Sequence, residues 1–102
     1  MKILCVCEGG NVRSRALAYV LHDLKGHEAI PVGTRWMQRE TWNLLGQWAD
    51  RIVVMQPHLQ AFVPTAFQFK VRVLDVGPDT YGLNISPSLM GQVHAGVDGV
   101  LS

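Results

Sequence analysis

The sequence predicts an α/β fold in three layers, with a four-stranded parallel sheet and helices on both of its faces. Four short runs of apolar or β-branched residues alternate with longer segments in which apolar residues recur every three or four positions. Strands that alternate with helices form parallel sheets, and these intervening segments are too long to be the turns of antiparallel hairpins. The length of 102 residues, 48% of them apolar, suits one domain with a buried core. We therefore expect residues 1–102 to fold as a single domain.

The expected strands are short runs that end at or near glycine or proline. They span residues 3–7, 29–32, 51–55 and 70–76. The first run is apolar throughout, which is typical of a strand that is buried on both faces of a sheet. The second run contains Pro31, whose nitrogen has no hydrogen to donate to a neighbouring strand, so we expect this strand at an edge of the sheet.

Two of the expected helices lie between strands and carry an apolar stripe along one side. The stripe of the first helix consists of Leu17, Val20, Leu21 and Leu24. Gly26 marks the end of this helix, because glycine readily adopts the backbone angles that end one. The stripe of the second helix consists of Thr41, Leu44, Leu45 and Trp48. This spacing places Trp48 in the core and Trp42 at the edge of the helix.

A further helix is expected near the end of the chain. Ser86 is suited to the N-cap position and Pro87 to the first helical position. The apolar residues that follow at helical spacing are Leu89, Val93, Val97 and Val100. A short helical segment is also expected at residues 59–62.

Charge and hydropathy exclude several classes of partner. Nine basic residues are balanced by eight acidic ones, which excludes a general polyanion binder, so we expect no nucleic-acid partner. No run approaches the ~20 apolar residues that span a membrane, and the first apolar run is too short for a signal peptide. We therefore expect a cytoplasmic protein with no membrane partner. The charged content of 17% is low enough to leave room for a homodimer.

The cysteines and histidines predict neither a disulfide nor a metal site. Cys5 and Cys7 are separated by one residue in a strand, which is a poor geometry for a disulfide. We expect Cys5 to be a buried core residue. The four histidines are not spaced as metal ligands, and we expect no metal and no cofactor.

The residues that carry chemistry follow the first strand. They read Cys7, Glu8, Gly9, Gly10, Asn11, Val12, Arg13 and Ser14. Glycine and asparagine tolerate unusual backbone angles, so the N–H groups of this loop can turn inward and form a nest for an anion. Arg13 at the start of the following helix can offer parallel donors to a tetrahedral oxyanion. The same positive field favours the thiolate form of Cys7, and Ser14 could donate a hydrogen bond to that sulfur.

The order of cysteine, five residues and Arg-Ser resembles the phosphate-binding signature of the cysteine-dependent protein tyrosine phosphatases. Its position near residue 7, at the end of the first strand, resembles the low-molecular-weight class of that group. Residues 49–55 and 74–81 are also similar to segments of these proteins. Two positions depart from the pattern, because Gly10 stands where the class usually has asparagine and Val12 where it often has a second cysteine.

The resemblance implies a fold, a reaction and a set of roles. Cys7 is the expected nucleophile, Arg13 and the loop residues 8–14 are expected to hold the phosphate, and no cofactor is required. Asp79 is the preferred general acid, and Asp75 is the second candidate. In the other interpretation Asp79 is an ordinary turn residue. Tyr81 is expected to contact the substrate, and it and Trp36 are candidates for stacking on an aromatic ring. Glu8 is expected at the rim of the site.

Several functions are compatible with this loop. The first is a phosphatase that acts on phosphomonoesters, with phosphotyrosine in a protein or a small molecule as the expected substrate. The second is a binding module for phosphate or phosphopeptides that has lost most of its catalytic activity. The third is an arsenate reductase that depends on an external thiol, since the chain has no cysteine after Cys7. Arg13 argues against a fourth, a phosphocarrier domain.

Overall fold

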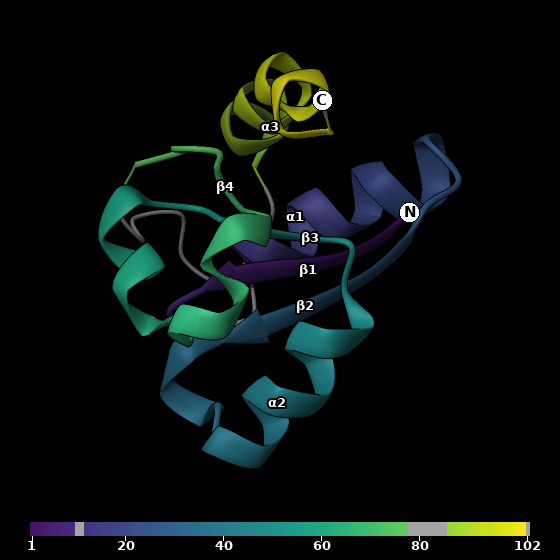
Figure 1. Cartoon of the computed structure of the whole chain (residues 1–102). Helices are drawn as coiled ribbons and strands as arrows, with labels where there is room; N and C mark the ends of the chain where they lie inside the picture. Colours follow the sequence, from purple (N-terminus) through teal and green to yellow (C-terminus); the bar gives the residue numbers. More distant parts are fainter. Residues whose placement is uncertain (10–11, 78–85, 102) are drawn as a thin grey trace.

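Strands and helices alternate along the chain, as the sequence predicts (Figure 1). This computed structural model describes residues 1–9, 12–77 and 86–101. The strands are β1 (Lys2–Cys7), β2 (Glu28–Gly33), β3 (Arg51–Val54) and β4 (Val71–Val73), and the α-helices are α1 (Arg13–Tyr19), α2 (Arg39–Trp48) and α3 (Pro87–Leu101). Four shorter helical segments are the π-helix η1 (Val20–Leu24) and the 3-10 helices η2 (Thr34–Trp36), η3 (Pro57–Phe62) and η4 (Thr65–Lys70).

The four strands form one parallel sheet in the order β2-β1-β3-β4. β2, the strand with Pro31, lies at an edge as expected, and the apolar β1 lies inside, paired on both sides. β4 is shorter than the expected 70–76, but the chain beyond it keeps contact with the sheet. The N–H of Leu74 donates to the carbonyl of Val54 at 2.9 Å, and the N–H of Val76 donates to that of Met55 at 3.2 Å.

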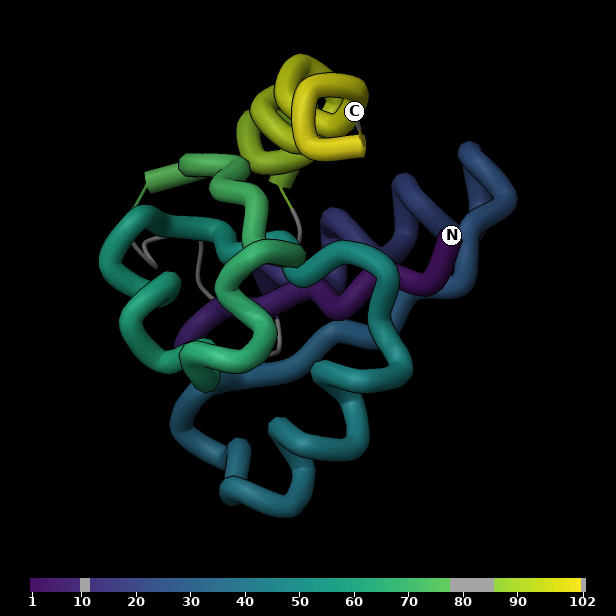
Figure 2. The backbone as a smooth tube through the Cα atoms, in the orientation of Figure 1, coloured from purple at the N-terminus to yellow at the C-terminus, as the bar shows by residue number. Residues whose placement is uncertain are grey.

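The sheet is the middle of three layers, which confirms the predicted architecture. One face packs against α1 and α3, and its core includes Cys5, Leu17 and Val93. The other face packs against α2, η3 and η4, and its core includes Leu4, Leu59 and Phe67 (Figures 1 and 2). None of the helices in the described ranges is long and apolar enough to span a membrane.

The predicted buried side of α2 is correct only in part. Leu45 and Trp48 pack partly buried against the core, but Trp42 is 7% exposed and lies in the core, whereas Leu44 is 72% exposed. The physical reason lies at Gly46, where a Cβ atom would come within 2.5 Å of the Phe67 ring. The ring occupies the space that a side chain would need, so α2 packs with its glycine side against η4.

The first helix departs from its predicted stripe only at the end. Leu17, Val20 and Leu21 are fully buried, whereas Leu24 is 54% exposed. Leu24 lies in the π-helix, where the N–H of Lys25 donates to the carbonyl of Val20 at 3.1 Å. This wider turn moves Leu24 away from the stripe. The helix ends at Gly26, whose φ of 76° is the left-handed conformation expected there.

The last helix agrees with its prediction in full. The Ser86 hydroxyl accepts a hydrogen bond from the N–H of Leu89 at 3.2 Å, as an N-cap residue does. All four predicted stripe residues are buried: Leu89, Val93, Val97 and Val100.

Candidate active site

The site lies at the carboxyl end of the sheet, where the chain leaves β1 and β3 at the left of Figures 1 and 2. Ligands of parallel α/β sheets bind at this end. Cys7 is the last residue of β1 and is 2% exposed, and Ser14 on the first turn of α1 is fully buried. The Cys7 Sγ lies 3.2 Å from the Ser14 Oγ. When the sulfur is ionised, the Ser14 hydroxyl is placed to donate to it.

Arg13 lies beside this pair and is 1% exposed. Its Nη1 donates hydrogen bonds to the Gln56 Oε1 at 2.6 Å and to the Gly77 carbonyl at 3.0 Å. Its Nε and Nη2 are buried and have no hydrogen-bond partner among the described residues. Because a guanidinium carries five N–H donors and Nη1 accounts for two, three donors are unpartnered. Buried charged donors without partners are rare in folded proteins, and they point to an absent ligand.

Two segments distant in the sequence hold Arg13 in place. Gln56 is the second residue after β3, and Gly77 lies in the turn after β4 with a φ of 80°. Asp75 stabilises that turn, because its Oδ1 accepts a hydrogen bond from the Gly77 N–H at 2.9 Å. Sequence analysis did not identify Gln56 or Gly77 as site residues. The available signal was that each follows a predicted strand at the carboxyl end of the sheet.

Glu8, the residue expected at the rim of the site, lines a cavity of about 350 Å³. The other lining residues are Thr34, Arg35, His58 and Phe62. The Glu8 carboxylate lies 3.1 Å from the His58 Nε2 and 3.9 Å from the Arg35 Nη2. The Glu8 carbonyl also accepts a hydrogen bond from the Arg35 N–H at 3.2 Å, which ties the segment after β2 to the loop. Arg35, His58 and Phe62 were not predicted as site residues.

The remaining predicted residues divide into three groups. Gly9 and the buried Val12 lie on either side of the undescribed part of the loop. Trp36 is 74% exposed and is not among the residues that line the cavity. The predicted residues Gly10, Asn11, Asp79 and Tyr81 lie outside the described residues.

Cys5 is fully buried in the core, two residues before Cys7 on the same strand. Burial and the nearby Cys7 both raise the pKa of the Cys5 thiol. Cys5 is therefore a neutral packing residue, as expected. Among the described residues no three His, Cys, Asp or Glu side chains are grouped so that they could hold a metal ion.

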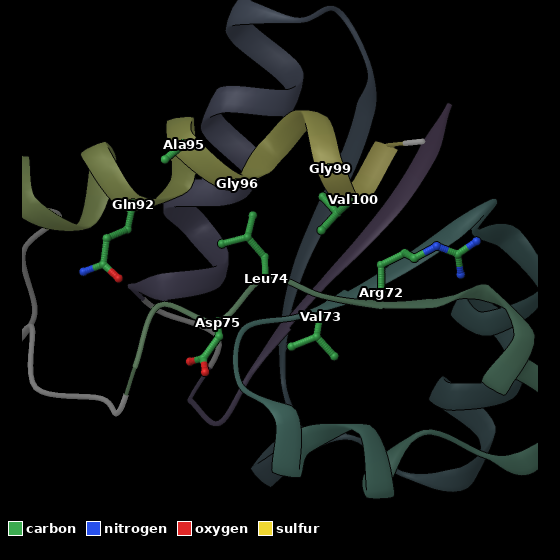
Figure 3. Close-up of a pocket in the computed structure, with 9 residues that line it drawn as sticks. All are labelled: Arg72, Val73, Leu74, Asp75, Gln92, Ala95, Gly96, Gly99 and Val100. Carbon is green, nitrogen blue, oxygen red and sulfur yellow. The ribbon is translucent and has the colours of Figure 1, made fainter.

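A larger cavity of about 580 Å³ lies elsewhere, between β4 with the residues after it and α3. In Figure 3 Leu74 points toward Gly96 on α3, and Asp75 and Gln92 lie at one end of the cavity. Neither Cys7 nor Arg13 lines it. They do not line the smaller cavity either, but that cavity is lined by Glu8, the residue directly after Cys7, and is therefore the one adjoining the loop.

Comparison with known proteins identifies the fold. No protein-family model matches the sequence, and no curated protein sequence matches it. Three solved structures are similar in fold. Wzb of Vibrio vulnificus, in complex with benzylphosphonate, is 17% identical, with a TM-score of 0.66 over 97% of this chain and 92% of that one. The tyrosine phosphatase AmsI of Erwinia amylovora is 14% identical, with a TM-score of 0.71 over 96% of this chain and 91% of that one.

The third similar structure is the arginine phosphatase YwlE of Geobacillus stearothermophilus. It is 16% identical to this chain, with a TM-score of 0.69 over 97% of this chain and 87% of that one. Identities this low establish a common fold, and the three alignments extend over nearly the whole chain. The protein has the low-molecular-weight tyrosine phosphatase fold that its sequence predicts.

Proposed function

We propose that the protein is a cysteine-dependent phosphatase that hydrolyses phosphomonoesters through a cysteinyl-phosphate intermediate. The observation that carries this proposal is the buried guanidinium of Arg13, with three unpartnered donors, beside the Cys7–Ser14 pair. An oxyanion with several acceptor atoms is the ligand that such a group requires. The fold supports the proposal, because it is shared with a tyrosine phosphatase and an arginine phosphatase.

In the first step the Cys7 sulfur attacks phosphorus, and the S–P bond forms as the bond to the leaving oxygen breaks. Arg13 Nε and Nη2, with the loop N–H groups, hold the non-bridging oxygens, whose charge is stabilised best in the transition state. Asp79 is the proposed acid that gives its proton to the leaving oxygen. Asp75 is less suited to this role, because its carboxylate accepts the hydrogen bond that stabilises the turn at Gly77.

In the second step water attacks the phosphoryl group, gives a proton to the same carboxylate and releases phosphate. Cys7 leaves as a thiolate. Ser14 is placed to donate a hydrogen bond to that sulfur, so it stabilises the leaving group of this step. The first step is therefore expected to depend less on Ser14 than the second.

The proposed substrate is an aryl phosphate such as phosphotyrosine, in a protein or a small molecule. The cavity lined by Glu8, the residue after Cys7, supports this choice, because Phe62 also lines it and offers an apolar face to a ring. We propose that Tyr81 and Trp36 stack on the aromatic ring of the same substrate. A binding module for phosphorylated ligands is the second candidate, because Asp75 already has a partner and turnover then depends on Asp79.

Hydrolysis of p-nitrophenyl phosphate by the wild type and by Cys7→Ser tests the proposal. We expect turnover in the wild type, inhibition by vanadate and no turnover in the variant. Turnover that persists in Cys7→Ser would contradict the assignment of the nucleophile. Absence of turnover in the wild type, with vanadate bound in a manner that depends on Arg13, would favour the binding module.

A further inference from the structure

Among the described residues, the hydrogen-bond partners of Arg13 are electrically neutral. The two groups that accept hydrogen bonds from it are the side-chain amide oxygen of Gln56 and the backbone carbonyl of Gly77. Arg13 takes part in none of the ion pairs found among the described residues. A buried cation without a counter-ion is costly for a folded protein, since its desolvation is not offset by an opposite charge.

We propose that Gln56 is a positioning residue that holds Arg13 through a neutral acceptor and so keeps the full charge of the guanidinium for a dianionic ligand. This inference rests on the proposed oxyanion site. Gln56 is suited to the role because it follows β3, which lies beside β1, and its Oε1 is 2.6 Å from the Arg13 Nη1. Both hydrogens of Nη1 are directed to neutral acceptors, so the orientation of the guanidinium is set without loss of charge.

Glutamate in place of Gln56 would have almost the same shape but would carry a negative charge beside Arg13. Its carboxylate would form a charge-assisted hydrogen bond with Arg13. The protein without an anion would gain stability, because the buried charge would acquire a counter-ion. A bound dianion would instead meet a negative charge close to its own binding group, and like charges in proximity weaken binding. In Gln56→Glu the stability without an anion should therefore rise, while the affinity for a dianion should fall.

The measurement is sulfate binding by calorimetry, with melting temperatures in sulfate-free buffer, in the Cys7→Ser background. That background contains no Cys7 thiolate, which would itself be a counter-charge for Arg13. We expect Gln56→Glu to weaken sulfate binding at least roughly tenfold and to raise the melting temperature by several degrees. We expect Gln56→Met, which has no oxygen acceptor, to lower the melting temperature and to weaken sulfate binding less.

Gln60→Glu is the matched control, since it adds the same charge on η3, the short helix that Gln56 precedes. The Gln60 side chain donates to the Gln68 Oε1 and is exposed, so we expect no change in sulfate affinity beyond about twofold. In the Cys7-containing enzyme, Gln56→Glu should raise KM for p-nitrophenyl phosphate with a smaller change in kcat. The added repulsion acts on the phosphate charge that substrate and transition state share, so it affects binding more than kcat, whereas a displaced Arg13 would lower kcat.

Equal sulfate affinities in Gln56→Glu and its background protein would overturn the inference. If Gln56→Glu does not fold, Arg13→Met decides the question. Loss of an uncompensated buried charge should leave the sulfate-free melting temperature unchanged or higher, and a fall of several degrees would overturn the inference. The proposed function is tested separately: turnover with no effect of Gln56→Glu rejects only this inference, and the predicted binding effects without turnover reject only the phosphatase.

Discussion

Two basic side chains, Arg13 and Lys70, lie against opposite faces of the sheet and have different environments. The Lys70 Nζ donates to the carbonyls of Gly46 and Ala49 at the end of α2, both at 2.8 Å. Its ammonium also lies 5.5 Å from the centre of the Phe67 ring. Lys70 thus has acceptors from a helix terminus and an aromatic face, which is the environment of a structural cation.

Arg13 has no comparable set of partners. It is more deeply buried than Lys70, yet three of its five donors are unpartnered among the described residues. The comparison teaches that burial alone does not distinguish a structural cation from a binding one. The distinguishing feature is whether the donors are satisfied by the protein itself, and on this criterion Arg13 is the cation that we propose binds an oxyanion.

The largest expected effect is that of Arg13→Lys. Lysine has the charge but lacks the paired donors that match a phosphate, so kcat/KM should fall on the order of 10²–10³-fold. Steady-state kinetics with p-nitrophenyl phosphate would measure this loss, and the melting temperature would show that the variant is folded. A loss below fivefold in a folded variant would contradict the role given to Arg13.

Ser14→Ala has the next largest expected effect on activity. Removal of the hydroxyl 3.2 Å from the Cys7 sulfur should lower kcat roughly 10–100-fold, since a hydrogen bond to a charged group is lost. Because the second step is affected most, a rapid burst of product should precede slow turnover in stopped-flow measurements. Slow turnover without a burst would place the effect on the first step instead.

Lys70→Met tests the comparison at the structural cation. Two hydrogen bonds to the last turn of α2 are removed, so the free energy of unfolding should fall by about 1–2 kcal/mol. Urea denaturation measures this change, and kcat/KM serves as the control. We expect kcat/KM within about twofold of the wild-type value. A tenfold loss of kcat/KM would contradict the assignment of Lys70 as a structural cation and Arg13 as a binding one.

The smallest expected effect belongs to Glu8→Gln at the rim. Its ion pairs with Arg35 and His58 are partly exposed, so the change in stability should be below about 1 kcal/mol. The loss of a negative charge beside the site should lower KM for an anionic substrate by roughly two- to threefold. The Gln60→Glu variant, with a charge change on an exposed side chain that does not line the cavity, is the control. A rise in KM would mean that Glu8 contributes to substrate binding rather than opposing it.

The local parts of this structure were predictable from sequence. The strands could be located because their apolar runs are continuous, and the last helix because Ser86 and Pro87 form a strong start signal. The spacing of Cys7, Arg13 and Ser14 identified the loop, and the 3.2 Å contact of Cys7 with Ser14 agrees with it. Each of these features depends on residues close together in the chain.

The parts that were missed depend on tertiary packing. Gln56 and Gly77 are 43 and 64 residues from Arg13, and no local pattern relates them. The burial of Trp42 in place of Leu44 was missed because the position of the Phe67 ring over Gly46 is set by η4, more than one element away. A helical pattern with tryptophans on two sides does not by itself identify the side that packs.

Direct detection of a phosphorylated cysteine tests the central claim of this account. The enzyme would be mixed with an excess of p-nitrophenyl phosphate, quenched in acid within milliseconds, digested and examined by mass spectrometry. Ser14→Ala, in which the intermediate should persist, would be treated in parallel. The account predicts one phosphoryl group on Cys7, more of it in Ser14→Ala, and none in Cys7→Ser. Turnover with no phosphoryl group on Cys7, or with one on another residue, would contradict it.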